Sequence, residues 1–332
     1  MSFTSRWLRM WLWVILSFIA SFLFFNSTFS YSHLFWPIII LFCCFNAYLE
    51  FIVSALFISP GPPKPPFQSD EWDSHLLSND SKSIHVQLYN QSYKAPLIVF
   101  IHGWRGSSAS VFDRAQWFVE KGWHAAIFEL PGHGQSTPLS RWNAISASKE
   151  ILFHLERFDI LLDSKKVSDF FLYGHSMGGY LCTRISKNPQ IIPYNLPISG
   201  IILESPLLLY SNILLEISDK LRIPKFIRPL HLKRVFREVK SMHPEIDVSD
   251  GLQQFDIPAW GLPSSPTLCL QAMNDARLGR DHYDAAVSHF TDSAPFTHHL
   301  IESLSHAGAR RNKEREELLL EWLKQFESLL LK

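Results

Sequence analysis

A run of forty consecutive residues, from Met10 to Leu49, contains no Asp, Glu, Lys or Arg. At about 1.5 Å of rise per helical residue, forty residues are twice the length that one crossing of a ~30 Å hydrocarbon core requires. Polar residues interrupt the run between Asn26 and His33. We therefore expect two transmembrane helices, near residues 8–25 and 35–57.

The charges around these segments indicate their orientation. Arg6 and Arg9 precede the first span, the loop between the spans has no basic residue, and Lys64 follows the second span. The positive-inside rule then places both ends, and with them the domain that follows the spans, in the cytoplasm. An alternative is a signal peptide over residues 1 to about 30, although its apolar core is long and no clear cleavage site follows. Because an ionised carboxylate is costly in lipid, we expect Glu50 near the end of its span, neutral, or beside a polar partner.

The rest of the chain divides by composition. Residues 1–59 are expected to form the membrane anchor and residues 60–83 a stiff proline-rich linker, since proline fixes φ and removes amide donors. Residues 84–332 are then a single domain. The 31 basic and 31 acidic residues balance, which argues against a nucleic-acid partner. Four cysteines show neither a disulfide framework nor metal-ligand spacing.

Short apolar runs recur along this domain and alternate with segments of helical length. Such alternation predicts an α/β fold with a doubly wound, mostly parallel sheet. Ligand chemistry in such sheets gathers beyond the carboxyl ends of the strands. Residues 84–90 alternate like a half-buried strand, and the expected further strands lie at residues 97–101, 125–130, 170–173, 198–203, 267–270 and 296–301.

A G-x-S-x-G motif, Gly174 to Gly178, follows one of these runs and precedes a helical stretch. A sharp turn from strand to helix lifts the hydroxyl of Ser176 clear of the sheet. Residues 174 and 178 must be small, because side chains there would collide. Ser176 is therefore the candidate nucleophile.

Three segments together resemble the α/β-hydrolase superfamily, in its esterase and lipase branches, such as monoacylglycerol lipases and lysophospholipases. These are Ile101 to Trp104, Pro131 to Ser136 and Gly174 to Gly179, and the resemblance covers about residues 84–326. It implies an inserted helical cap and a serine–histidine–acid triad, with no metal or organic cofactor.

The resemblance also assigns the partners of the serine. The acid is Asp275, which ends a segment from Pro266 that has Ala272 where the family usually has glycine, and the base is His306 after the last strand. The chain order of serine, acid and histidine is the one that this topology requires. Backbone amides of Met177 and Trp104 are the expected oxyanion-hole donors.

Other residues compete for these roles. Glu204 follows a strand at a position where some relatives carry the acid, and Asp281 is nearby in the sequence. His298 and His299 compete for the role of base, but they are adjacent within the last strand, so one of them faces away from the site. The histidines that we assign mainly to turn and loop packing are His102 and His133.

About sixty residues separate Glu204 from Pro266, which is too many for a simple connection. We expect a helical cap at about residues 207–262. Its segment from Lys220 to Lys240 has eight basic residues and one acid, a net charge of +7, with apolar residues interleaved. Such a segment can lie on an anionic membrane, or it can be a solvated basic face.

The sequence therefore predicts a membrane-anchored serine hydrolase that cleaves a carboxylic ester of a small amphiphilic molecule, such as a lipid acyl ester, with membrane lipid as its other partner. Acyl transfer to an alcohol or thiol would use the same residues. A catalytically silent binding module of the same fold is the alternative from another class, and the intact triad argues against it. The sequence does not indicate an oligomeric state.

Overall fold

The structure is a computed structural model that describes residues 5–27, 32–60, 64–79, 82–187, 194, 196–249, 251–290, 295–307 and 310–329. Its internal contacts divide the chain into two compact units. One unit comprises Met1–Ile58 and Ile213–Gln254, and the other comprises Ser59–Asn212 and Phe255–Lys332. The middle of the segment expected as a cap thus belongs to the same unit as the N-terminal helices.

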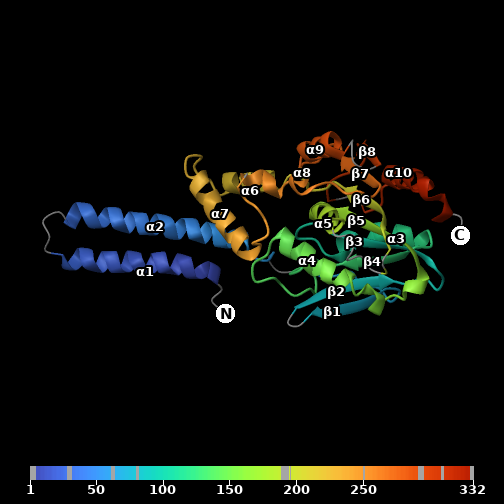
Figure 1. The fold of residues 1–332 in the computed structure, drawn as a ribbon, viewed down its shortest axis with the longest axis horizontal. Coiled ribbons are helices and arrows are strands. Elements are labelled where there is room, and N and C mark those ends of the chain that lie inside the picture. Colours follow the sequence, from blue (N-terminus) through green and yellow to red (C-terminus); the bar gives the residue numbers. More distant parts are fainter. Residues whose placement is uncertain are drawn as a thin grey trace. The chain divides into compact units, whose positions relative to one another are not determined.

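Two long apolar helices begin the first unit. They are α1 (Ser5–Asn26) and α2 (Ser32–Leu56), which pack side by side (Figure 1). Aromatic rings join them, with the Trp13 and Phe42 centroids 5.7 Å apart in an edge-to-face arrangement. Both helices are long and apolar enough to cross a membrane, over Trp7–Asn26 and Phe35–Leu56. These are the stretches in which the sequence predicts two spans.

The same unit contains most of α6 (Tyr210–Lys220) and all of α7 (Arg228–Met242). A proline in the first turn, where an amide donor is not required, favours the start of α7. Helix α7 packs against α2 (Figure 1). There Glu50 is 2% exposed and lies beside polar partners, which is one of the three alternatives expected for it.

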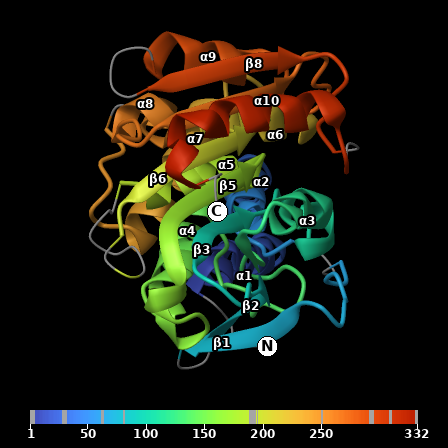
Figure 2. The same ribbon diagram turned by 90° about the vertical axis from the view of Figure 1, so that its right-hand side faces the viewer.

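The second unit is built on an eight-stranded sheet with the order β1-β2-β4-β3-β5-β6-β7-β8. Pairing is antiparallel from β1 through β2 to β4 and parallel everywhere else, which confirms the prediction of a mostly parallel sheet. The strands are β1 (Asp73–Asn79), β2 (Lys82–Tyr89), β3 (Ala95–Ile101), β4 (His124–Phe128), β5 (Val167–His175), β6 (Ile198–Glu204), β7 (Thr267–Ala272) and β8 (Phe296–Ile301). Figure 2 shows the sheet from β1 at one edge to β8 at the other.

Strand β1 corrects the expected boundary between linker and domain. It lies within residues 60–83, which the sequence predicts to be a linker, and it pairs along its whole length with β2. Most of its side chains are polar, and none is fully buried. An edge strand of this kind has no apolar run for sequence reasoning to detect.

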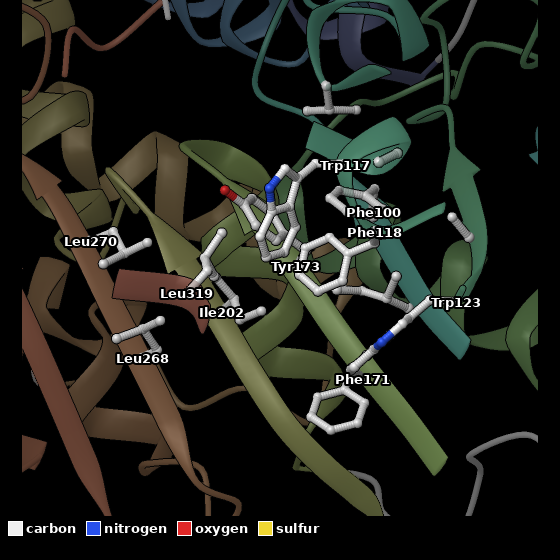
Figure 3. Packing of buried hydrophobic residues seen from close by; sticks show 14 of the residues in the cluster. Phe100, Trp117, Phe118, Trp123, Phe171, Tyr173, Ile202, Leu268, Leu270 and Leu319 are labelled. Carbon is white, nitrogen blue, oxygen red and sulfur yellow. The ribbon is translucent and has the colours of Figure 1, made fainter. Parts of the chain in front are cut away.

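Helices cover both faces of this sheet. Side chains from α3 and α10 pack with alternate residues of the central strands, including Phe100, Phe171 and Tyr173, in one apolar cluster (Figure 3). Helices α4 and α5 pack against each other and contact strands of the sheet, and α3 and α4 lie on opposite sides of it (Figure 2). The helices of this unit are α3 (Phe112–Glu120), α4 (Ala144–Leu155), α5 (Met177–Ile185), α8 (Ile257–Trp260), α9 (Asp281–Phe290) and α10 (Lys313–Leu323).

Candidate active site

Ser176 occupies the single residue between the end of β5 and the start of α5. Its backbone has φ 54° and ψ −118°, a conformation that is strained for a residue with a side chain. The glycines around it make this turn possible. A Cβ atom on Gly174 would lie 2.5 Å from the carbonyl oxygen of Gly178, and one on Gly178 would lie 1.9 Å from that of Ile101. Both positions therefore require glycine, as the motif predicts.

The structure brings Ser176, His306 and Asp275 together in one hydrogen-bonded chain. His306 Nε2 lies 3.1 Å from Ser176 Oγ, and His306 Nδ1 lies 2.8 Å from Asp275 Oδ2. The Asp275 carboxylate is buried, whereas the imidazole of His306 is 13% exposed. The imidazole thus lies within hydrogen-bonding distance of a hydroxyl on one side and of a carboxylate on the other.

Asp275 is held by further donors. Its Oδ1 accepts hydrogen bonds from the amides of Arg277 and Leu278, both at 2.9 Å, and Gln271 Nε2 donates to Oδ2, also at 2.9 Å. Burial alone would raise the pKa of this carboxyl. The hydrogen bonds from His306 and from the two amides outweigh burial and lower the pKa of Asp275 to about 2, so the group is ionised at neutral pH.

Glu204, the alternative acid, lies in a different buried cluster. Its carboxylate accepts hydrogen bonds from Arg114 Nε at 2.8 Å and from Arg315 Nη1 at 3.3 Å, and the Tyr173 hydroxyl also donates to it. Burial opposes the charge, but the two guanidinium groups hold the pKa of Glu204 well below its usual range. No hydrogen bond or ion pair between Glu204 and His306 is present in the described part of the chain. Asp281, the other alternative, lies exposed in the first turn of α9.

The competing histidines lie elsewhere. His298 Nδ1 is 2.7 Å from the Tyr283 hydroxyl, and both His298 and His299 lie within β8. His102 Nε2 accepts a hydrogen bond from the Leu130 amide at 3.2 Å, so it packs a loop as predicted.

The two residues expected to supply the oxyanion-hole amides, Met177 and Trp104, belong to segments that reach Ser176. Met177 begins α5, where the first amides have no partner within the helix. A Cβ atom on Gly103 would lie 3.0 Å from Ser176 Cβ, so the loop that carries Trp104 passes close to the serine. Among the described residues, neither the amide of Trp104 nor that of Met177 donates a hydrogen bond to a protein group.

His133 supports this loop. Its Nε2 accepts a hydrogen bond from the Arg105 amide at 3.0 Å, and Arg105 has a positive φ of 60°. The Trp104 ring packs edge-to-face against the rings of both His133 and Trp142. His133 therefore fixes Arg105, the residue that follows Trp104, and so restrains the loop that carries the Trp104 amide.

Sequence reasoning missed the contribution of His175, the residue before the nucleophile. Its Nε2 lies 2.6 Å from the backbone carbonyl oxygen of His306. The motif treats this position as variable, and a contact between residues 131 positions apart leaves no local signal. Within the described ranges, no three His, Cys, Asp or Glu side chains are grouped so that they could hold a metal ion.

Comparison with known families and folds agrees with this geometry. Residues 96–264, half of the chain, match the sequence model of the alpha/beta hydrolase fold family. The structure resembles an esterase from Pyrococcus furiosus with a TM-score of 0.58 at 12% identity, covering 82% of this chain and 98% of the esterase. It also resembles a putative hydrolase from Agrobacterium vitis, with a TM-score of 0.54 at 16% identity, covering 78% and 99%. These likenesses confirm the predicted fold class.

Two curated relatives share part of the sequence. A protein named phospholipase YtpA from Bacillus subtilis is 31% identical over 121 residues, which is 34% of this chain and 40% of the relative. A 1-acylglycerol-3-phosphate O-acyltransferase from Arabidopsis thaliana is 25% identical over 131 residues, which is 39% of this chain and 31% of the relative. Each match thus spans less than half of the relative's own length.

Proposed function

Because this chain belongs to the α/β-hydrolase family, we propose that it is a membrane-anchored serine hydrolase that cleaves a lipid acyl ester through an acyl-Ser176 intermediate. The observation that carries the proposal is the unbroken hydrogen-bonded chain from Ser176 through His306 to Asp275. A silent binding module would not require a serine held in a strained backbone conformation within hydrogen-bonding distance of a buried imidazole–carboxylate pair.

In the first half of the reaction, Ser176 Oγ attacks the carbonyl carbon of the ester while His306 Nε2 accepts the hydroxyl proton. Asp275 accepts a hydrogen bond from Nδ1, which fixes the tautomer and stabilises the imidazolium. The amides of Trp104 and Met177 donate to the oxyanion of the tetrahedral intermediate. The intermediate collapses, the bond to the leaving oxygen breaks, and His306 gives its proton to the departing alcohol.

In the second half, water takes the place of the alcohol. His306 accepts a proton from the water as its oxygen attacks the acyl carbon, and the proton then passes to Ser176 Oγ as the bond to the acyl group breaks. The products are a carboxylic acid and the free serine. Transfer of the acyl group to an alcohol follows the same steps with the alcohol as the attacking group.

Two observations support a lipid as the acyl donor. The N-terminal helices are long and apolar enough to cross a membrane, and an enzyme anchored by them would lie next to membrane lipids. The sequence relatives include proteins named as a phospholipase and as a 1-acylglycerol-3-phosphate O-acyltransferase, and both names refer to lipid esters. The second name makes acyl transfer the second candidate function.

Labelling with a fluorophosphonate tests the nucleophile. The purified full-length protein should react rapidly, and Ser176→Ala should abolish both labelling and ester hydrolysis while leaving the thermal midpoint nearly unchanged. Ser186→Ala is a matched control, because Ser186 is also buried at the end of α5 and donates only within its helix, to the Thr183 carbonyl. Undiminished labelling of Ser176→Ala would exclude Ser176 as the nucleophile, and absence of labelling in the native protein would favour the binding module.

Product analysis separates hydrolysis from transfer. A radiolabelled monoacyl lipid should yield free fatty acid in water, and the same assay with a lysophospholipid acceptor measures transfer. Predominant fatty acid in the presence of acceptor supports the hydrolase. Predominant acylated acceptor would assign the chain as an acyltransferase with the same triad.

Retention of the first helix is supported by its contacts. Arg9 of α1 pairs with Glu50 of α2 at 3.3 Å and also with Glu238 of α7. A cleaved signal peptide would leave both acids without this cation. We place the catalytic domain in the cytoplasm, on the charges that flank the spans.

Cysteine accessibility tests this topology. In a Cys44→Ala background, Ser30→Cys should react with an impermeant maleimide on intact cells, and Ser69→Cys should react only after the cells are opened. The other three cysteines are buried. External labelling at position 69 would place the domain on the opposite side. Residue 30 lies outside the described residues, and its use depends only on its place in the sequence between the two helices.

A further inference from the structure

Exposed apolar side chains concentrate in one short segment of the cap that the sequence predicts at about residues 207–262. In the described part of the chain from residue 64 onward, eight large apolar side chains are exposed, and four of them lie between residues 215 and 230. Phe226 is 81% exposed, which is the highest value among the eight. A single exposed apolar side chain is ordinary, but four within sixteen residues mark a surface that contacts something apolar. The four are Leu215, Leu221, Phe226 and Leu230.

The cations of this region fall into two groups. Arg228 pairs with Asp219, and Arg234 and Arg237 share the Glu50 carboxylate, so each of these three guanidinium groups already has a carboxylate partner. These three of the eight cations in the stretch that the sequence predicts as a membrane-facing or a solvated basic face thus pair with carboxylates of the protein. The cations between residues 221 and 233 that make no ion pair within the described residues are Arg222, Lys225 and Lys233, all exposed. In the sequence they are interspersed with the exposed Leu221, Phe226 and Leu230.

The Glu50 carboxylate sets the position of α7 relative to the candidate spans. Arg237 Nη2 lies 2.7 Å from both carboxylate oxygens, and Arg234 Nε lies 3.1 Å from one of them. Arg9, two residues inside the start of the first candidate span, contacts the same carboxylate. Glu50 is six residues before the end of the second span, which is about 9 Å along a helix. In a bilayer crossed by both candidate spans, helix α7 would therefore meet the two helices near the membrane–water interface.

Leu230 lies one turn before Arg234 on the side of α7 that faces α2, and Arg234 also donates to the Leu230 carbonyl. The ion pairs of Arg234 and the exposed Leu230 are thus on the same helix, and Phe226 lies two residues before its start. Apolar side chains at interfacial depth, with lysines and arginines beside them, are the composition of a segment that lies in the headgroup region of a bilayer.

We propose that residues 215–233 form an interfacial membrane-binding element, held at headgroup depth by the ion pairs of Arg234 and Arg237 with Glu50. Leu221, Phe226 and Leu230 enter the acyl-chain boundary, and Lys225 and Lys233 contact lipid phosphates. The occupant of this surface is the lipid bilayer in which α1 and α2 are inserted. The inference therefore depends on the membrane anchor of the proposed function, and it is independent of the chemistry at Ser176.

Fluorescence quenching in vesicles tests the proposal. The full-length Cys44→Ala protein is reconstituted in vesicles of phosphatidylcholine and phosphatidylserine, and Phe226→Cys carries an environment-sensitive fluorophore. Lipids with a spin label near the headgroup should quench this fluorophore more than lipids with a spin label near the chain end. Quenching as weak as at a position in water would overturn the proposal.

Two matched positions calibrate the measurement. Ile160→Cys, at a residue 73% exposed in the other unit, should show little quenching by either lipid. Phe18→Cys, at a residue 71% exposed near the middle of α1, should be quenched most by the label near the chain end. An unquenched fluorophore at position 18 would refute the anchor itself and the inference with it. Quenching at position 18 without quenching at position 226 would refute the inference alone.

The role of the ion pairs is tested by Glu50→Gln. Loss of the carboxylate should reduce headgroup-level quenching at position 226 and leave quenching at position 18 unchanged, whereas Glu245→Gln, which neutralises an exposed acid after α7, should change neither. Unchanged quenching at position 226 in Glu50→Gln would overturn the part assigned to the ion pairs.

The role of the lysines is tested by the double substitution Lys225→Gln with Lys233→Gln. It should remove the difference in quenching at position 226 between vesicles with and without phosphatidylserine. Persistence of that difference would overturn the contact of the two lysines with lipid phosphate.

Discussion

The imidazole of His175 donates a hydrogen bond from Nε2 to the backbone carbonyl oxygen of His306, across 2.6 Å. Burial lowers the pKa of His175 to about 4, so the ring is neutral at pH 7 and its proton lies on the nitrogen that faces this carbonyl. The residue before the nucleophile thus connects the strained turn at Ser176 to the loop that carries the base. Two of the three triad residues are fixed relative to each other by this contact.

The first prediction follows from that contact. His175→Phe should lower kcat/KM by about tenfold, because a lost hydrogen bond is worth roughly 0.5–1.5 kcal/mol and a tenfold change in rate corresponds to about 1.4 kcal/mol. His175→Gln keeps a side-chain donor and should recover part of the loss. The measurement is kcat/KM on a soluble short-chain ester. Equal activities of His175→Phe and the native protein would show that the contact does not position His306.

The second prediction separates the two candidate acids. Asp275→Asn should lower turnover by about 10⁴-fold, because the imidazole loses its orienting carboxylate, with a small change in the thermal midpoint. Glu204→Gln should instead destabilise the fold by about 3–5 kcal/mol, because it leaves the Arg114 and Arg315 guanidinium groups buried without their carboxylate. Turnover per folded molecule should change far less. Turnover and thermal unfolding of both variants are the measurements, and the reverse pattern would assign the acid to Glu204.

Much of the sheet could be predicted because its central strands are buried on both faces. Such strands read as continuous apolar runs, and the runs expected at residues 97–101 and 198–203 lie within β3 and β6. Strand β1 could not be predicted, because an exposed edge strand is held by backbone pairing with β2 rather than by apolar side chains. Gly174 and Gly178, beside the sharp turn at Ser176, could be predicted from the motif, because the need for a small residue there arises from neighbouring backbone.

Site residues that directly follow a predicted strand could be identified from the sequence. Contacts between segments far apart in the sequence could not. Ser176 and His306 each follow a strand of the sheet, and their convergence follows from the parallel topology. The choice between Asp275 and Glu204 needed the structure, because both lie at the carboxyl ends of strands in the same sheet, Glu204 as the last residue of β6 and Asp275 just after β7. The pairing of Glu50 with Arg234 joins residues 184 positions apart, and composition alone could not separate paired cations from free ones.

The third prediction concerns the need for glycine beside the strand-to-helix turn at Ser176, which we call the elbow. Gly178→Ala should prevent formation of the turn, because its Cβ atom would lie 1.9 Å from the carbonyl oxygen of Ile101, which cannot move without displacing β3. Gly251→Ala is the control, since Gly251 has a φ of +84° and nothing within 4 Å of its Cβ position. The control should cost only the backbone penalty of about 1–2 kcal/mol. The yield of folded protein and the thermal midpoint are measured. A Gly178→Ala variant as stable as Gly251→Ala would show that the elbow has room for a side chain at position 178.

The last prediction concerns acid sensitivity. Burial lowers the pKa of His133 to about 3 and that of His282 to about 4, as it does for His175. Each of these groups has an ordinary pKa near 6.5 in the unfolded chain, so between pH 6.5 and pH 4 the unfolded chain binds protons that the folded chain does not. The free energy of unfolding should therefore fall as the pH is lowered through this window. At pH 5 each histidine contributes a loss on the order of 2 kcal/mol.

His282 offers a clean test of this explanation. Its Nδ1 accepts hydrogen bonds from the amides of Leu208 and Leu209, at 2.9 and 3.1 Å, and a glutamine carbonyl can accept in its place without titrating. His282→Gln should therefore reduce the drop in thermal midpoint between pH 7 and pH 5, measured on the full-length protein in detergent. His289→Gln removes an exposed histidine from the same helix and should keep the native drop. If both variants lose stability with acid as the native protein does, the buried neutral state of His282 is not a source of the acid sensitivity, which must then arise from other groups.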